Sequence, residues 1–409
     1  MANKNFTQFG LSSFAGNADY LVGYSKDGNQ ELRYTAGSLL TGGNYDFIIN
    51  GVNAGRGQGG TDNIVFGARA LNNISPGTRN IAIGNFALSA CKDGLENIAI
   101  GTYALASLSG GDYSWQNLAI GNWALSSLRY DLGNYAIGHY ALKSAIGSNP
   151  AIAPAASRVV NNLALGREAM TSALTASHCT GLGHFTFQSM LSGENSVAVG
   201  SFAAYDITAS VQNTYVGVFA GINARRYNCT MLGYYANTTG NNQVQLGNSL
   251  TTTYAYGAVQ DRSDIRDKAD VRDTTLGLDF IMALRPVDFK WDLRDSYKTL
   301  PPAAPSPEAT EQAKENHRIL MEQWTQANDI NNIVHDGTHK RSRYHHGLIA
   351  QEVKQMLDDK GIDFGGYQDH SIKGGKDVQS IGYNELVAPL IKAIQELKQE
   401  FDAYKASHP

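Results

Sequence analysis

Ser263 and Lys268 have the residue types and the spacing that could break a peptide bond. A serine hydroxyl is a poor nucleophile at neutral pH unless a neighbouring base accepts its proton. A lysine can be that base when partial burial favours its neutral form. The two residues open and close the segment SDIRDK, about two-thirds of the way along the chain. Serines near lysines are common in soluble proteins, so an exposed charged turn is the alternative interpretation.

The composition of the chain changes at this segment. Residues 1–262 hold 14 Lys and Arg against 13 Asp and Glu, a net charge of +1, whereas residues 263–409 hold 19 against 24, a net charge of −5. The length of 409 residues allows two or three domains. A total net charge of −4 gives no reason to expect nucleic-acid binding.

Three further segments follow SDIRDK in order: LDFIMALRPVDFKWD at 278–292, HHGLIAQEVKQML at 345–357 and IGYNELVAPLIKAIQELKQEF at 381–401. Together the four segments resemble the intramolecular chaperone auto-processing domain, or endosialidase-type chaperone peptidase, at the C-terminus of phage tail fibres and tail spikes. The resemblance covers residues 263–409 and implies an α+β domain that drives assembly. It also implies self-cleavage between Arg262 and Ser263, with Ser263 as nucleophile and Lys268 as proton acceptor.

Two features depart from the pattern of that family. The family usually has an apolar residue before the lysine, and this chain has Asp267. An adjacent carboxylate favours the charged lysine and weakens it as a base, so the efficiency of cleavage stays open. A polar stretch at about 296–343 lies between two of the family segments and is interpreted as an insertion.

Neither a membrane segment nor a disulfide framework is indicated. No run of about 18 apolar residues occurs, and the first ten residues lack the apolar centre of a signal peptide. We therefore expect a soluble protein, made in the host cytoplasm and, by the resemblance, built into the virion tail. Cys91, Cys179 and Cys229 have no metal-type spacing and are expected to be reduced packing residues. His345 and His346 have no third ligand at suitable spacing, so no metal or other cofactor is predicted.

An internal repeat dominates residues 61–262. Eleven glycines from Gly67 to Gly247 are spaced so that six of the ten intervals are 17 residues, which is a solenoid period. Each glycine ends a short strand of the type NIAIG, in which period 2 is visible. The residue before the glycine is always Phe, Ile, Leu or Val, and we expect it to point into a core. The residue before that is usually alanine, which suits close approach of neighbouring backbone.

A second block with an aromatic residue and an alanine follows most of the glycines, as in NFAL at 85–88 and NWAL at 122–125. The coil is therefore predicted to have two strands joined by two turns, with the glycine at a tight corner. A short helix is the alternative for the second block. Longer turns at about 110–116 and 147–160 are expected to project from the shaft, and Tyr113 and Trp115 are the predicted receptor-binding residues.

The repeats resemble the head of trimeric autotransporter adhesins, a left-handed parallel β-roll in a homotrimer. This resemblance covers roughly 63–247 and implies three chains around a shared core. The predicted fold is thus mainly β: a trimeric β-roll shaft followed by the α+β chaperone domain. Residues 1–60 are expected to form a small β region for attachment or capping. The cluster GRGQGG at 55–60 lacks the context of a phosphate-binding loop and is interpreted as a linker.

The last segment is predicted to be an amphipathic helix whose narrow apolar stripe suits a coiled-coil seam. A helix packed on its own domain is the alternative. The stripe consists of Val387, Leu390, Ile391, Ile394, Leu397 and Phe401. A second helix, rich in charges, is predicted at about 307–328.

Two function classes stay in view. The first is a phage tail fibre or spike that binds a host glycan or protein, associates with other tail proteins and contains a self-cleaving serine peptidase. The second is a spike that degrades polysaccharide, which needs two carboxylates a few ångströms apart. The shaft offers only scattered acids, of which Glu168 and Glu194 are the best candidates, and both are expected to be exposed loop acids. Binding without turnover chemistry is favoured in the shaft.

Overall fold

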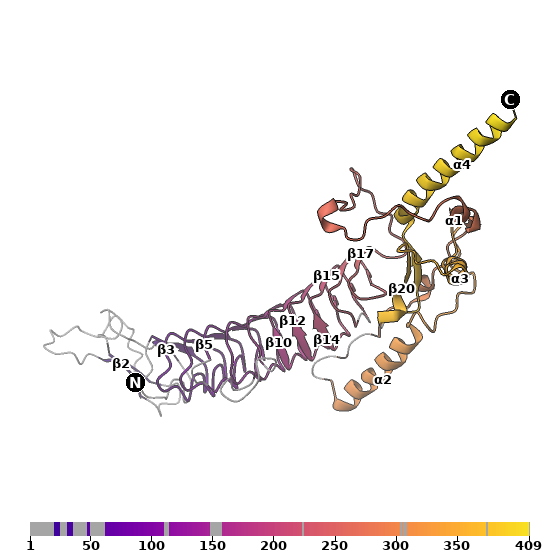
Figure 1. Ribbon diagram of the computed structural model, residues 1–409. Coiled ribbons are helices and arrows are strands. Elements are labelled where there is room, and N and C mark those ends of the chain that lie inside the picture. Colours follow the sequence, from indigo (N-terminus) through magenta and orange to yellow (C-terminus); the bar gives the residue numbers. More distant parts are fainter. Residues whose placement is uncertain are drawn as a thin grey trace. The chain divides into compact units, whose positions relative to one another are not determined.

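The computed structural model (Figure 1) describes residues 20–24, 31–35, 47–49, 62–109, 114–147, 158–222, 225–302, 305, 309–373 and 375–408. The chain divides into two compact units, residues 1–177 and residues 178–409. Both units contribute coils to a parallel β-solenoid of about ten turns that spans residues 64–246. The expected solenoid is therefore confirmed for one chain, and the trimer stays a prediction.

In the first unit the strands are short and pair in sequence order. Each three-residue strand lies parallel to the corresponding three residues of the next coil, as Ile81 does with Ile98. An antiparallel pair, β1 (Tyr20–Tyr24) and β2 (Glu31–Thr35), precedes them, where short strands were expected. The parallel strands are β3 (Phe47–Ile49), β4 (Ile64–Phe66), β5 (Ile81–Ile83), β6 (Ile98–Ile100), β7 (Leu118–Ile120), β8 (Tyr135–Ile137) and β9 (Leu163–Leu165).

The second unit continues the same pattern and adds a second row of strands. The main row, visible in Figure 1 from β15 to β17, is β11 (Thr180–Leu182), β13 (Val197–Val199), β15 (Thr214–Val216), β16 (Thr230–Leu232) and β17 (Val244–Leu246). The second row comprises β12 (Ser192–Glu194) and β14 (Ala209–Val211), which pair in parallel, and the first unit holds a similar strand, β10 (Thr175–Ser177).

The block after each glycine is not a strand, so the predicted position of the second strand is wrong. In the block NFAL, Phe86 and Leu88 have φ values of 61° and 51°, and the chain there forms a run of turns. A short helix is equally excluded for this block. Positive φ at non-glycine residues costs energy, and it is tolerated here because hydrogen bonds to the neighbouring coil fix the backbone, such as Leu88 N–H to Ala104 O at 3.0 Å.

The two faces of the strands are also reversed relative to the prediction. The central alanine of each motif, such as Ala82 and Ala99, is fully buried inside the coil. The flanking apolar residues, such as Ile81 and Ile83, are half-buried and lie on the outer face. In these coils a methyl group fills the inner position and the larger branched residues lie outside, whereas β15 and β16 have Tyr215 and Met231 buried at the same inner position. The core is completed by the leucine of the second block, for example Leu88 and Leu125.

The corner role of the glycines is confirmed. Gly121 has a φ of +131°, and a Cβ added to it would lie 2.5 Å from the carbonyl oxygen of Gly138 in the next coil. Gly200 has a φ of +122°, and its Cβ would lie 2.8 Å from the carbonyl oxygen of Gly217. Both the backbone angle and the close approach of the coils therefore require glycine.

The C-terminal region of the second unit has a small mixed core. The three segments 278–292, 345–357 and 381–401 meet in it, because Phe280, Val353, Leu357, Phe364 and Leu386 form one buried cluster. Its elements are α1 (Leu278–Ala283), β18 (Val287–Phe289), α2 (Glu311–Ala327), β19 (His345–Gly347), α3 (Ala350–Lys360), β20 (Tyr367–Asp369), β21 (Gln379–Ile381) and α4 (Val387–Ser407). The predicted α+β class and the charged helix near 307–328 are confirmed.

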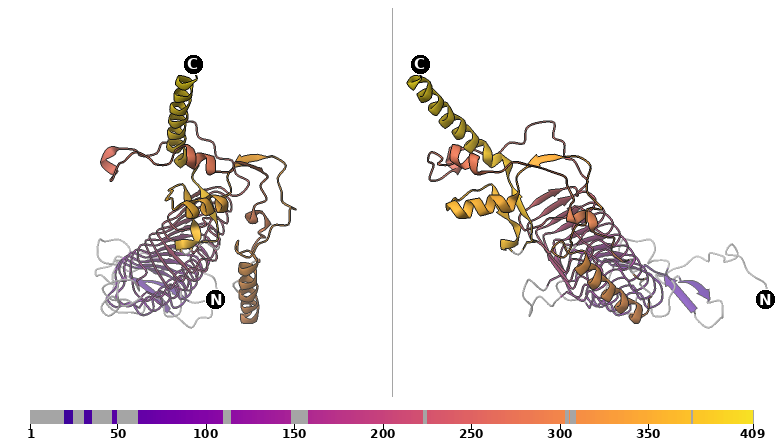
Figure 2. Two further views of the ribbon diagram at one scale, coloured as in Figure 1. Left: turned by 45° about the vertical axis from the view of Figure 1, so that its right-hand side comes forward. Right: turned by 90° about the vertical axis from the view of Figure 1, so that its right-hand side faces the viewer.

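Helix α4 has two apolar faces with different surroundings. Pro389 and Ala393 are buried against the rest of the C-terminal region, and Glu396 Oε2 accepts a hydrogen bond of 2.7 Å from Leu278 N at the start of α1. The predicted stripe from Val387 to Phe401 is exposed, with Ile394 at 66%. Figures 1 and 2 show α4 extending away from the elements that precede it. Among the described residues, none covers this stripe.

Candidate functional site

The segment that carries Ser263 and Lys268 is a single 3₁₀ turn. The turn spans Ile265–Asp267, and Asp264 caps it by accepting a 2.9 Å hydrogen bond from the backbone N–H of Arg266. The Arg266 guanidinium also donates to this carboxylate and holds the pKa of Asp264 below its usual value. Aspartate is a favoured residue at this position because its side chain satisfies a free N–H of the first turn.

The turn brings Ser263 and Lys268 into direct contact. Lys268 Nζ lies 2.8 Å from Ser263 Oγ, which is the distance needed for proton transfer. Both residues are exposed to solvent in one chain. The two side chains therefore have the contact that a Ser/Lys dyad needs, and no described residue of the chain buries them.

A second contact runs beside the first. Arg262 Nε lies 2.7 Å from Asp267 Oδ2, so the residue before the predicted cut is bound by the residue before the lysine. The contacts Arg262 to Asp267 and Ser263 to Lys268 both join positions five residues apart. Asp267 thus contacts Arg262, the residue on the N-terminal side of the predicted cut, and the sequence did not indicate this contact.

The predicted receptor-binding pair is described in part. Trp115 is 41% exposed and forms an isolated parallel bridge with Leu95. Tyr113 lies outside the described residues, as does the cluster at 55–60. Among the described residues, Trp115 therefore presents part of its ring at the coil surface.

The two acids considered for glycan hydrolysis have different surroundings. Glu168 is buried at 5% exposure and accepts from Arg167 Nε at 3.2 Å, so the expectation that it is an exposed loop acid is wrong. Glu194 is exposed at the end of β12, as expected.

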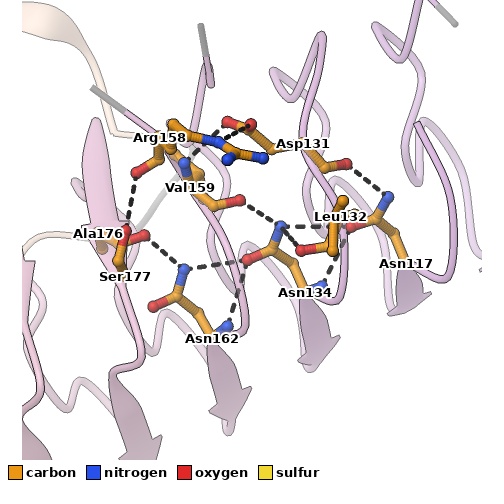
Figure 3. Close-up of polar contacts among 9 residues, drawn as sticks. All are labelled: Asn117, Asp131, Leu132, Asn134, Arg158, Val159, Asn162, Ala176 and Ser177. Atoms are coloured by element: carbon orange, nitrogen blue, oxygen red, sulfur yellow. Dashed lines mark hydrogen bonds and ion pairs between the residues drawn. The ribbon is translucent and has the colours of Figure 1, made fainter. Parts of the chain in front are cut away.

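A ladder of buried asparagines, which the sequence analysis did not assign, runs inside the first unit. Figure 3 shows part of it: Asn117 Oδ1 accepts from the backbone N–H of Asn134 at 3.1 Å, and Asn134 Oδ1 accepts from Asn162 Nδ2 at 3.0 Å. The same residues donate to turn carbonyls, as Asn134 Nδ2 does to Val159 O at 2.6 Å. The signal was present, because an asparagine precedes most motif strands, as in NIAIG and NLAIG.

Beside this ladder a buried acid anchors one of the longer turns. Asp131 is fully buried; its Oδ2 accepts from Val159 N at 2.8 Å and its Oδ1 lies 3.3 Å from Arg158 Nε (Figure 3). The carboxylate thus binds the end of the inserted turn that returns to the coil. Its role is structural, because both oxygens are used to hold the backbone and the guanidinium.

None of the three comparisons, with protein-family models, curated proteins and solved structures, gives a match to this chain.

Other candidate sites add no catalytic centre. Cys91, Cys179 and Cys229 are buried and form no disulfide bond, as expected, and burial raises the pKa of Cys91 to about 12. Within the described part of the chain, no group of three or more His, Cys, Asp or Glu residues could hold a metal ion. His345 and His346 lie in β19, which pairs with β18. No helix among the described residues is long and apolar enough to cross a membrane.

A cavity of about 610 Å³ lies in the second unit. Phe219 and Tyr235 from the last coils line it together with Trp324, Lys298 and Arg341 from the C-terminal region. Its lining therefore comes from both sides of the predicted cut. Scission and release would take this cavity apart, so a released shaft could not use it as a receptor pocket.

Proposed function

We propose that this protein is a homotrimeric phage tail fibre or tail spike that binds the host cell surface. Its residues 263–409 are an assembly chaperone that cuts itself away between Arg262 and Ser263. The observation that carries the proposal is the 2.8 Å contact between Ser263 and Lys268, placed in a capped turn between the last solenoid coil and the C-terminal core.

Two exposed apolar surfaces support three-chain assembly. The outer face of the solenoid carries a row of large apolar side chains, among them Tyr135 at 45%, Leu165 at 41% and Leu246 at 47% exposure. The stripe on α4 is a second such surface. Continuous apolar surface of this kind usually marks an interface, and a narrow helical stripe suits a coiled coil of identical chains.

The chemistry proposed for the dyad needs the assembled state. Ser263 Oγ attacks the carbonyl carbon of Arg262, and its proton passes to Lys268. The bond from that carbon to the nitrogen of Ser263 then breaks, the nitrogen takes a proton, and water hydrolyses the resulting ester. Neighbouring chains around the turn would exclude water and favour neutral Lys268, so that cleavage follows assembly.

The host-binding role is proposed for the shaft. Of the two candidate acids, Glu168 is buried beside Arg167, and Trp115 offers an exposed aromatic face, so binding of a host glycan or protein is favoured over polysaccharide degradation. Contact through Tyr113 and Trp115, attachment to other tail proteins and a place in the virion tail belong to the same proposal.

Intact mass spectrometry of freshly expressed protein tests the proposal. We expect two products, residues 1–262 and 263–409, from the parent chain, and an uncut chain from Ser263→Ala and from Lys268→Ala. Light scattering should give a trimer for all three proteins, because assembly does not depend on the cut. A parent chain that forms trimers and is never cut would refute the dyad, and a cut monomer would refute the link between cleavage and assembly.

A further inference from the structure

We propose that the end of the solenoid is a binding surface for the β20–β21 hairpin of the C-terminal region. We further propose that this surface accepts His370 only as the neutral imidazole, so that acidification detaches the hairpin.

The contact lies just before β17, the last strand of the solenoid sheet. The backbone N–H of Lys376 donates to Thr239 O at 2.7 Å, which ties the loop of the hairpin to the coil. His370 Nδ1 lies within hydrogen-bond distance of Thr239 Oγ1 and 3.2 Å from Gln243 Nε2. A sheet edge needs such a cover, because its free backbone groups would otherwise pair with another chain.

The orientation of the Gln243 amide determines the protonation of His370. Gln243 Oε1 accepts from the backbone N–H groups of Thr239 at 3.0 Å and Gly240 at 2.9 Å. The amide nitrogen is therefore the atom that faces the imidazole, and it can only donate. In the neutral ring His370 Nδ1 accepts this hydrogen bond, while the Thr239 hydroxyl can donate to Gln243 Oε1, 3.4 Å away. The proton of the neutral ring is then on Nε2, which donates to Ser380 Oγ at 3.0 Å.

A second proton on His370 would place the Nδ1–H donor of the ring against the N–H donor of the Gln243 side chain. The hydroxyl of Thr239 can rotate to accept from Nδ1, whereas the Gln243 amide cannot turn without losing both backbone hydrogen bonds. The attachment of the hairpin therefore opposes protonation. Burial lowers the pKa of His370 below its ordinary value, and the adjacent Asp369 acts in the opposite direction. Lys376 brings a further charge to the loop, and its Nζ lies 2.5 Å from Asp329 Oδ2.

The direction in which pH changes the attachment of the hairpin follows from these contacts. Because the pKa of His370 is lower when the hairpin is attached, the attached state binds fewer protons than the open state. Attachment is strongest above the ordinary histidine value of about 6.5 and is lost as the pH falls below it. The inference does not depend on scission. If the chain is cut, the same contact joins the two products and acid would promote their separation.

Hydrogen exchange of the full chain measured by mass spectrometry tests the proposal, in a Ser263→Ala background so that the chain stays whole. Peptides covering 367–381 and 239–247 are compared at about pH 7.5 and about pH 5.5, with labelling times scaled for intrinsic exchange. The opening equilibrium of both segments should increase on the order of tenfold at the lower pH. No change in either segment would overturn the proposal.

The isosteric variant Gln243→Glu gives the sharpest control. Its carboxylate can still accept from the backbone of Thr239 and Gly240, and it can also accept from a doubly protonated His370, so protection should now increase on acidification. His370→Gln should remove the pH response, and His335→Gln, at an exposed position, should keep it. His317 lies 3.4 Å from Tyr205 Oη, and burial also lowers the pKa of His317, so His317→Gln must leave the hairpin response intact. A response that follows His317, or that keeps its sign in Gln243→Glu, contradicts the proposed recognition.

Discussion

The solenoid coils and the C-terminal region bury their side chains in different ways. Each coil from β5 to β8 encloses a fully buried alanine and leucine, and the asparagines of these coils are hydrogen-bonded from coil to coil. The C-terminal region has one cluster of five buried residues and leaves the stripe of α4 in solvent. The comparison indicates that a coil is stabilised by its neighbours along the chain, whereas the C-terminal region leaves an apolar helical stripe exposed, which we propose is covered by the same stripe of other chains.

Removing residues 263–409 should have the largest effect on the folding and assembly of the solenoid. The parallel coils have non-local contacts and unpaired edges until the stack is complete, so folding is slow and open to aggregation. A trimeric C-terminal region would hold three chains together at high effective concentration. We expect residues 1–262 expressed alone to be insoluble or monomeric, measured by sedimentation and light scattering. A soluble trimer from this truncation would show that the shaft assembles without a chaperone.

Replacing a corner glycine should cause the next largest loss, measured as the free energy of unfolding. In Gly121→Val or Gly200→Val, a β-branched residue must adopt a positive φ and also overlap the carbonyl of the next coil. We expect a loss of at least about 3 kcal/mol in the free energy of unfolding, or failure to fold. Gly257→Val is the matched control, because nothing lies within 4 Å of its added Cβ. Equal melting temperatures for Gly121→Val and the control would exclude the corner role.

The sequence predicts the solenoid well because its period is set by backbone geometry. The spacing of Gly67, Gly84 and Gly101 locates every strand that ends at a glycine. The sequence could not tell which face is inside, since an apolar isoleucine and a small alanine both fit an interior. The course of the chain after each glycine decides this, and in the block NFAL it includes positive φ at Phe86 and Leu88. Local residue preferences oppose such a turn, so only the stacked neighbours reveal it.

The candidate site was predicted less completely. The pairing of Ser263 with Lys268 follows from their positions once a turn is assumed. The partner of Asp267 does not follow from the sequence. Asp267 stands between Arg266 and Lys268 and could pair with either of them or with Arg262. Asp264 caps the turn and occupies Arg266, which leaves Arg262 for Asp267.

Interrupting the asparagine ladder should have a smaller effect than altering a glycine corner. Asn117 donates its backbone N–H to Asn97 Oδ1 at 3.0 Å and its side chain to Asp131 O at 3.0 Å. Asn117→Leu keeps the side-chain volume and the backbone hydrogen bond, but it removes the side-chain hydrogen bonds to Asp131 O and from the backbone N–H of Asn134, so we expect a loss of about 2–4 kcal/mol by chemical denaturation. Asn117→Ser should cost less, because Ser196 occupies the corresponding place in its coil and accepts from Asn213 N at 3.2 Å. Equal stability of the leucine variant and the parent would show that the ladder is not a stabilising feature.

The smallest expected effect concerns Asp267, for which two physical arguments oppose each other. If its carboxylate acts mainly on the charge of Lys268, Asp267→Leu should speed the cut and move the pH profile of cleavage to lower pH. If it acts mainly through Arg262, the same change frees the residue before the scissile bond and should slow the cut at every pH. We expect the second outcome, because the 2.7 Å contact is with Arg262.

An exposed ion pair contributes little, so the cleavage rate of the Asp267→Leu variant, followed by intact mass spectrometry, should fall only about two- to five-fold. Asp267→Asn should lie between the parent and the leucine variant, since an amide can still accept from the guanidinium. In Arg262→Leu the further change Asp267→Leu should have no effect on the plateau rate. A faster cut with a shifted pH profile in that double variant would assign Asp267 to Lys268 instead.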